Sequence, residues 1–322
     1  MNTQKKYWAY ILSLFVVMAG LYLTVTIFET PSYKYYVQQV QVIRDGYPIS
    51  DYPTVTYLLH YVSLVTGDIS TGMRVITIFC MFASMILILK VITDKPEFWW
   101  LVFIIPFNPF TYMMVEAALL RNIVAFPLLA LLMLNMKQLD TEQSGLNISK
   151  TLVTLLLLYC VHNLSVVLGA GMVCLYLLLS HIDIKIKVGS ILVGMSLAII
   201  VLFESRFTVL PWMLGNMWVN WPRIFETVTY VPVATSFFIF LLSLLYSKHL
   251  HVRTLSMIGL LLHLGTWIAP QGIGLRLLYY TPVLLPVALY SNIKTRNYVG
   301  LQLFSVVLSI AHFLALLISL TR

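Results

Sequence analysis

The chain has 322 residues, of which 60% are hydrophobic and only 10% are charged, and its mean hydropathy is +0.90. This composition excludes a soluble globular domain. Because a chain in lipid must satisfy its own backbone hydrogen bonds, it predicts an all-α, polytopic transmembrane bundle. The net charge of +8 indicates lysine and arginine in the inside loops of a cell-membrane protein rather than affinity for nucleic acid.

The first apolar run, residues 8–28, follows Lys5 and Lys6, which predicts a cytoplasmic N-terminus. About twenty apolar residues are long for a cleavable signal, so this run is interpreted as the first span. Residues 29–70 then form the first outer loop. Within it, the apolar residues between Tyr36 and Tyr47 recur at three- and four-residue spacing, which predicts an amphipathic helix lying in the membrane interface.

A second short apolar run in this loop starts at Pro53 and ends before Gly67. A helix of about 20 Å is too short for a hydrocarbon core of ~30 Å, so we expect a partly buried helix on the outer side. Ten further spans complete an arrangement of eleven: 71–92, 98–107, 111–136, 151–161, 164–180, 188–204, 228–247, 254–269, 275–292 and 298–320.

Two predicted breaks fall at Pro106–Pro109 and at His162–Asn163. An alternative with nine spans treats 151–180 as one long helix and keeps the later loops on the same sides. Residues 205–227 contain three tryptophans and are interpreted as a second outer loop at the interface. No linker or clear internal repeat divides the chain, which predicts a single integral membrane domain over 1–322.

The distribution of charge agrees with the eleven-span arrangement. It places twelve of the twenty basic residues inside: Lys5, Lys6, Lys90, Lys95, Lys137, Lys150, Lys185, Lys187, Lys248, Arg253, Lys294 and Arg296. The outer connections hold seven of the twelve acids: Glu29, Asp45, Asp51, Asp68, Glu116, Glu204 and Glu226. This is the asymmetry that the positive-inside rule describes.

Three ionisable residues lie inside or at the edge of apolar runs: Arg121, His162 and Arg276. Charge in hydrocarbon is costly, so such residues are candidates for function. Snorkelling of an arginine, or a histidine that satisfies a freed carbonyl, would explain them without a site. Glu116 lies five residues before Arg121, about 140° around a continuous helix, so the two are not expected to pair with each other.

Two acidic residues of the first outer loop are further candidates. Glu29 closes the first span. Asp51 precedes Tyr52-Pro53, and a structural role in a turn would also explain this aspartate. Carboxylates beside arginines suit a phosphate-linked sugar, because a guanidinium binds phosphate through two parallel bonds and a carboxylate can act as a general base. No histidine pair has metal-ligand spacing, so a divalent cation stays an open alternative that residue spacing does not support.

The segment ETPSYKYYVQQVQVIRDGYPISDYPTVTYLLHYVSLVTGDISTGMR, residues 29–74, resembles the first outer loop of GT-C-type membrane glycosyltransferases. The resemblance implies transfer of a sugar from a polyprenyl-phosphate carrier to a lipid, glycan or protein acceptor at the outer face. Glu29 would be the loop carboxylate. The chain departs from the family in having Glu29-Thr30 where many members have an aspartate or an acidic pair, and in its short length.

A second resemblance is carried by Arg121, by His162-Asn-Leu-Ser165 and by Arg276-Leu-Leu-Tyr279, which are similar to EpsG-like and Wzy-like polysaccharide polymerases. The second resemblance implies arginines that hold a polyprenyl pyrophosphate donor. We expect Arg121 and Arg276 to bind the donor phosphate, with Tyr279 and Glu116 nearby. Glu29 or Asp51 would act on the acceptor, and His162 near the leaving group. No redox cofactor is expected. A lipid-linked oligosaccharide flippase or other transporter, and a non-catalytic membrane subunit, remain alternatives.

Overall fold

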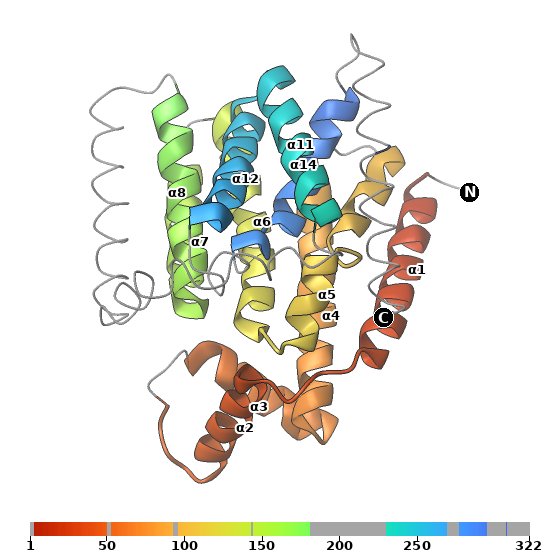
Figure 1. The fold of residues 1–322 in the computed structure, drawn as a ribbon, viewed down its shortest axis with the longest axis vertical. Helices are drawn as coiled ribbons and strands as arrows, with labels where there is room; N and C mark the ends of the chain where they lie inside the picture. Colours follow the sequence, from red (N-terminus) through yellow and green to blue (C-terminus); the bar gives the residue numbers. More distant parts are fainter. Residues whose placement is uncertain are drawn as a thin grey trace.

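The computed structural model of the protein describes residues 3–49, 53–92, 96–142, 144–180, 230–268, 277–294 and 307. In these residues all regular structure is helical, with eleven α-helices, one 3₁₀ helix and no strand (Figure 1). The predicted all-α class is confirmed for this part of the chain. The elements are α1 (Thr3–Thr24), α2 (Pro31–Arg44), α3 (Pro53–Thr66), α4 (Ile69–Ile92), η1 (Pro96–Ile104), α5 (Pro109–Glu116), α6 (Leu120–Thr141), α7 (Gly145–Val161), α8 (Asn163–Leu179), α11 (Tyr230–Tyr246), α12 (Leu250–Ile268) and α14 (Thr281–Lys294).

Two described helices, α4 and α6, are long and apolar enough to cross a membrane, with 24 and 22 residues. Shorter apolar helical segments of 10–17 residues lie at Phe15–Thr24, Gly145–Val161, Asn163–Leu179 and Pro232–Tyr246. This set is compatible with a multi-pass membrane protein. The predicted span 188–204, the predicted span 298–320 apart from residue 307, and the predicted loop 205–227 lie outside the described residues.

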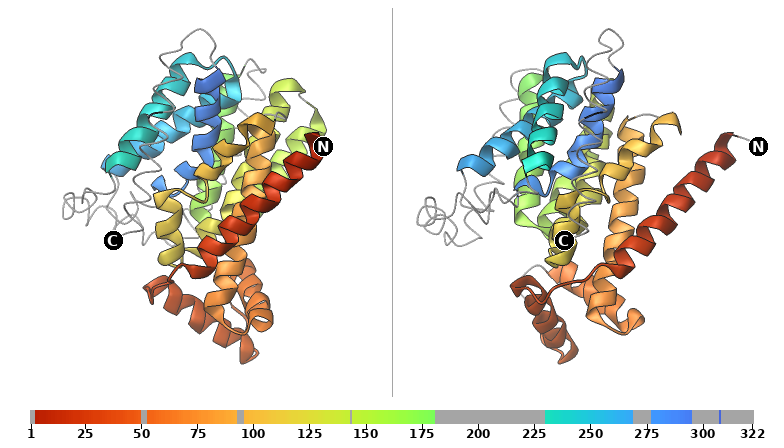
Figure 2. Two further views of the ribbon diagram at one scale, coloured as in Figure 1. Left: turned by 90° about the vertical axis from the view of Figure 1, so that its right-hand side faces the viewer. Right: turned by 45° about the vertical axis from the view of Figure 1, so that its right-hand side comes forward.

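The centre of the bundle is formed by α4 packed along α6. The hairpin of α7 and α8 packs against α6, and α12 packs against both α8 and α6, with α11 and α14 beside it. Side chains from α4 and α6 fill this centre, and Met81, Ile88, Leu129 and Met133 are fully buried. The helix α1 contacts the bundle along α4, at its edge (Figure 2).

One end of the bundle carries the two short helices α2 and α3, which pack on each other (Figure 1). The hydroxyl oxygen of Thr30 accepts a hydrogen bond from the backbone N–H of Tyr33 and caps α2, while Pro31 opens its first turn. Tyr36 and Val40 are its buried residues. The predicted amphipathic helix is therefore confirmed, although it ends before Tyr47, which is exposed.

The predicted continuous helix over 111–136 is wrong, because the chain breaks between α5 and α6. The N–H of Leu119 bonds the carbonyl of Met114, and the N–H of Ala118 bonds that of Val115, which closes a Schellman motif. A Schellman motif requires one residue in the left-handed backbone conformation. Here that residue is Ala118, whose φ is 56°. Glu116 and Arg121 therefore lie on different helices, and the expected separation of about 140° around one continuous helix does not apply to them.

Two other expectations change in the structure. The nine-span alternative with one helix over 151–180 is wrong, because His162 is extended, with φ of −164°, and separates α7 from α8. The His162 ring lies within hydrogen-bond distance of Ser165 and Tyr280, and these contacts favour the break. In place of the predicted helical span 98–107, the chain forms the 3₁₀ helix η1, which rises about 2.0 Å per residue.

Candidate functional site

The candidate site lies around the start of α6, at the end of the bundle that carries α2 and α3. Two consecutive residues of α6, Arg121 and Asn122, enter two different groups of side chains. Arg121 contacts α2, and Asn122 bonds a tyrosine at the start of α14. The break before α6 places both at a helix terminus rather than in the middle of a long span, so side chains from other elements can reach them.

The segment that follows α1 is tied to the turn between α5 and α6. The backbone N–H of Phe28 donates to the carbonyl of Glu116 at 3.0 Å. The hydroxyl of Thr30 donates to the carbonyl of Ala117 at 2.9 Å. These two bonds flank Glu29, which is exposed. The structure therefore brings the backbone at Glu29 beside the backbone at Glu116, two predicted site residues 87 positions apart.

Glu116 is the last residue of α5 and is half-buried. Burial raises the pKa of its carboxyl group, and a hydrogen bond from Tyr112 partly offsets this effect. The same carboxylate contributes, after burial, to a raised pKa of the Tyr112 hydroxyl.

The guanidinium of Arg121 packs over two tyrosine rings of α2. Its central carbon lies 5.2 Å from the ring centroid of Tyr35 and 5.9 Å from that of Tyr36. Arg121 also forms a hydrogen bond with the Tyr36 side chain. The partner that this arginine needs in an apolar run is thus an aromatic pair on α2. A guanidinium stacked on aromatic rings keeps its positive charge.

A second group of polar side chains surrounds the hydroxyl of Tyr280, which is fully buried. This hydroxyl lies 3.0 Å from Nδ1 of His162 and 2.8 Å from Oγ of Ser165, and it accepts a bond of 3.2 Å from Asn122 Nδ2. Nδ1 of His162 also lies 3.1 Å from Ser165 Oγ. The group joins α6, the α7–α8 junction and the start of α14.

The predicted site residues fall into four sets. The structure brings Glu29, Glu116 and Arg121 around α2 and the α5–α6 turn, and it brings His162 to the group around Tyr280. Tyr279 is buried, with 7% exposure, but the hydroxyl in that group belongs to the next residue. Asp51 and Arg276 lie outside the described residues.

Sequence reasoning missed Tyr36, Asn122 and Tyr280. The pair Tyr279-Tyr280 is visible in the sequence, but only the packing of α14 decides which hydroxyl faces His162. Asn122 carried a usable signal, because a polar amide beside Arg121 in an apolar run also needs a partner. In the described part of the chain, no group of three or more His, Cys, Asp or Glu side chains could hold a metal ion.

In comparisons with known proteins, no family model, no curated protein and no solved structure matches this chain. Function is therefore inferred from the residues and their geometry. The arrangement offers a guanidinium for an anion, carboxyl groups at Glu29 and Glu116 for proton exchange, and a histidine bonded to a buried tyrosine. These groups lie on adjacent segments at one end of the bundle.

Proposed function

We propose that the protein is a multi-pass membrane glycosyltransferase that moves a sugar from a polyprenyl-phosphate or polyprenyl-pyrophosphate carrier to a lipid, glycan or protein acceptor. The observation that carries the proposal is the convergence around the start of α6. There the Glu29 segment, Glu116 and Arg121 lie beside one another, and Asn122 links α6 to His162 through Tyr280. Arginine and carboxyl groups together provide what a phosphate-linked donor and a hydroxyl acceptor need.

The proposal includes about eleven spans with the candidate site at the outer face. Charge supports this orientation, because the helices α4, α6 and α14 carry Lys90, Lys137 and Lys294 near the end opposite to the candidate site. The acidic residues Glu29 and Glu116 lie at the site end. By the positive-inside rule, the proposed orientation has the lysines and the N-terminus in the cytoplasm.

Exposed apolar side chains support the placement in lipid. On α7 they form a stripe at helical spacing, with exposed fractions between 44% and 62% at Leu152, Val153, Leu156 and Leu157. Leu12, Val16 and Phe79 are also well exposed on α1 and α4. Apolar surface of this extent is unusual on a water-soluble monomer and is what acyl chains would cover.

In the proposed mechanism Arg121 binds the donor phosphate, and Arg276, Tyr279 and Glu116 assist it. Glu29 or Asp51 accepts the proton of the attacking hydroxyl, and His162 forms a hydrogen bond near the leaving phosphate. The cation–π contacts to Tyr35 and Tyr36 hold the Arg121 guanidinium in place without cancelling its charge. The protein's partners would be the donor, membrane lipids and the acceptor.

A polysaccharide polymerase of the EpsG-like or Wzy-like kind is the second candidate function. The observation that favours it is the group formed by His162, Ser165 and Tyr280, since two of these residues carried that resemblance in the sequence. A polymerase would use the same polyprenyl-linked donor and would add it to a growing glycan. The two candidates therefore differ in the acceptor.

The test is a transfer assay in membranes with a panel of radiolabelled polyprenyl-phosphate and polyprenyl-pyrophosphate sugars. We expect Arg121→Ala and Glu29→Gln each to reduce transfer by roughly 10²-fold or more, as loss of a charge-stabilising or proton-accepting group does. Arg44→Ala is the matched control, because Arg44 is an exposed arginine at the end of α2. Equal transfer by all three variants and the wild type would contradict the proposal.

A further inference from the structure

The half-buried ring of His162 turns one of its nitrogens, Nδ1, toward two hydroxyl groups. Nδ1 lies 3.1 Å from Oγ of Ser165 and 3.0 Å from the hydroxyl of Tyr280, and these two oxygens lie 2.8 Å from each other. The three groups form a closed triangle of contacts. Ser165 and Tyr280 are fully buried, so their hydroxyl hydrogens bond protein atoms rather than water. The hydrogens of this triangle therefore decide which ring nitrogen of His162 is protonated.

Asn122 sets the first of these bonds. Its Nδ2 can only donate, so the oxygen of Tyr280 accepts there, at 3.2 Å. The hydroxyl hydrogens of Ser165 and Tyr280 then need acceptors of their own. If Nδ1 of His162 carries no hydrogen, one hydroxyl donates to Nδ1 and the other donates to its neighbouring hydroxyl, so both hydrogens are used. If Nδ1 carries a hydrogen it cannot accept, and one hydroxyl hydrogen finds no acceptor within the triangle.

The acidity of the three groups favours the same arrangement. A phenol is a stronger acid than an aliphatic hydroxyl, and an imidazole nitrogen without hydrogen is a stronger base than either hydroxyl oxygen. A bond from Tyr280 to Nδ1 of His162 thus joins the best donor of the group to its best acceptor, and Ser165 can donate to the Tyr280 oxygen. In a neutral imidazole whose Nδ1 accepts, the hydrogen is on Nε2.

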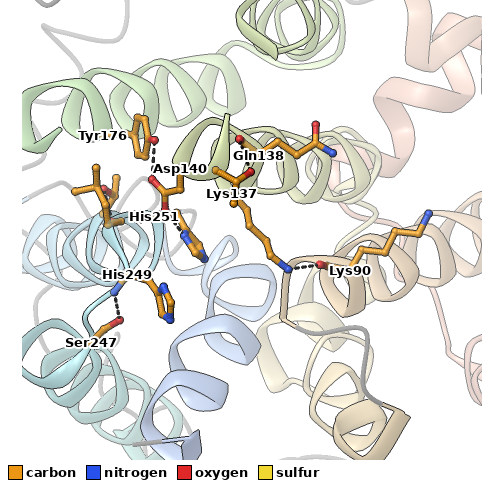
Figure 3. Close-up of polar contacts among 11 residues, drawn as sticks. Lys90, Lys137, Gln138, Asp140, Tyr176, Ser247, His249 and His251 are labelled. Carbon is orange, nitrogen blue, oxygen red and sulfur yellow. Dashed lines mark hydrogen bonds and ion pairs between the residues drawn. The ribbon is translucent and has the colours of Figure 1, made fainter. Parts of the chain in front are cut away.

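A histidine at the opposite end of the bundle has the other tautomer (Figure 3). Nδ1 of His251, on α12, lies 2.5 Å from Oδ2 of Asp140, which also accepts from the backbone N–H of His251 at 3.1 Å. Oδ1 of Asp140 accepts from the Tyr176 hydroxyl at 2.6 Å. An ionised carboxylate only accepts, so Nδ1 of His251 carries a hydrogen. The neighbours of Nδ1 in His162 are hydroxyls, which can donate, and this difference separates the two histidines.

We infer that Ser165 and Tyr280 hold His162 as the tautomer with its hydrogen on Nε2, and that this N–H donates to an oxygen of the donor phosphate. An anionic phosphate oxygen accepts hydrogen bonds, so a neutral histidine must present an N–H to it. Ser165 and Tyr280 are positioning residues, because they act through His162. The step toward phosphate rests on the proposed function, whereas the tautomer is a property of the folded protein alone.

Nitrogen NMR spectroscopy of the full-length protein in lipid, with isotope-labelled histidine rings, measures the tautomer. Spectra are recorded at alkaline pH, where a histidine ring carries one hydrogen, because ring nitrogens with and without hydrogen resonate far apart. The signals that disappear in His162→Gln are those of His162. We expect the hydrogen on Nε2 in His162 and on Nδ1 in His251, which is the internal reference. A hydrogen on Nδ1 of His162 in the wild type would overturn the inference.

Two substitutions test whether the hydroxyls set this tautomer. Ser165→Ala and Tyr280→Phe each leave one hydroxyl that can donate to Nδ1, so each variant should retain the hydrogen on Nε2. The double variant removes both donors, and we expect it to lose the single tautomer and to show a signal for hydrogen on Nδ1. An unchanged His162 tautomer in the double variant would remove Ser165 and Tyr280 from the positioning role.

The matched control combines Ser149→Ala with Tyr47→Phe, which deletes the same two chemical groups at exposed positions. It should leave the His162 signals unchanged. An unshifted His251 signal shows that the Ser165→Ala, Tyr280→Phe double variant keeps its fold. If that variant does not fold, the wild-type spectrum and the two single variants still decide the inference.

Substitutions at position 162 test the role of the N–H in transfer. The amide nitrogen of a glutamine reaches the place of Nε2, and that of an asparagine reaches the place of Nδ1. We expect His162→Gln to retain roughly tenfold more transfer than His162→Asn, because only the former can replace the donor. Equal transfer by the two variants would overturn the donation to phosphate. Absence of transfer by the wild type would contradict the proposed function, and the tautomer would still be decided by the NMR spectra.

Discussion

At the scale of single residues, the Tyr280 hydroxyl connects parts of the chain that are more than 100 positions apart. Its neighbours are Asn122, His162 and Ser165, and all three bonds lie between 2.8 and 3.2 Å. Because the tyrosine is fully buried, these side chains replace the water that its hydroxyl would otherwise bind. The bonds also hold the α7–α8 junction to α6.

Tyr280→Phe should lower the free energy of unfolding by about 1–3 kcal/mol, because it leaves buried polar partners without their acceptor. The measurement is denaturation in detergent, followed by circular dichroism. Tyr47→Phe is the control, since Tyr47 is 67% exposed, and should change stability by less than about 0.5 kcal/mol. A double-mutant cycle with Asn122→Ala should show a coupling of at least ~0.5 kcal/mol. Additive effects would mean that the bond contributes nothing.

At the residue level, the sequence predicted that a charge interrupting an apolar run needs a partner. Arg121 and His162 were found in this way, because an ionisable group in hydrocarbon needs a partner that the structure then provides on α2 and α14. The partners themselves could not be found. Tyr36 reads as one of several aromatic residues on α2, and nothing in the sequence distinguishes Tyr280 from Tyr279.

At the scale of elements, some helices end where the sequence predicts and others, such as α5, do not. Gly46 and Gly67 take φ values of 81° and 87° after α2 and α3, as a left-handed helix end favours. After α5 the same conformation is taken by Ala118, which carries no such signal. The break before Arg121 is therefore a result of tertiary contacts, including the bond from Phe28 to Glu116.

Close packing of elements leads to a prediction for α8. A Cβ added at Gly169 would lie 2.9 Å from Leu158 Cδ1 and within 3.2 Å of atoms of Leu155 and Leu132, whereas Gly171 has nothing within 4 Å. We expect Gly169→Ala to destabilise the protein by about 1–3 kcal/mol through overpacking. Gly171→Ala in the same helix should be neutral, or stabilising by up to ~1 kcal/mol through helix propensity.

Thermal unfolding of the two alanine variants side by side measures this difference. The comparison is well matched, because both substitutions are made in one helix two residues apart and share the same gain in helix propensity. If Gly169→Ala is as stable as Gly171→Ala, then α8 does not approach α7 and α6 as closely as the structure has it.

At the scale of the whole molecule, the two ends of the bundle differ in chemistry. One end brings carboxyl groups, Arg121 and aromatic rings of α2 together, and the other brings Asp140 and the histidines together with lysines at helix ends. The same helix, α6, contributes to both ends. An orientation in the membrane follows from this asymmetry if the lysine end is cytoplasmic.

Single-cysteine labelling tests that orientation, after replacement of Cys80, Cys160 and Cys174. We expect a membrane-impermeant maleimide to label Asp45→Cys in intact cells, and to label Lys248→Cys only after permeabilisation. Leu156→Cys, on the exposed stripe of α7, should stay unlabelled in both conditions, because lipid covers it. Labelling of positions 45 and 248 from the same side would contradict the orientation, and rapid labelling at 156 would contradict the membrane placement of α7.

The sequence by itself determined the all-α class and the amphipathic helix after the first apolar run, because apolar periodicity and turn residues act locally. It left open whether one helix runs through His162, and the structure decided that the chain breaks there. Only the tertiary structure decided that α5 and α6 are separate helices, that Arg121 packs on Tyr35 and Tyr36, and that Asp140 joins α6 to α8 and α12. These contacts bring together residues distant in the sequence, and their positions depend on how complete helices pack against one another.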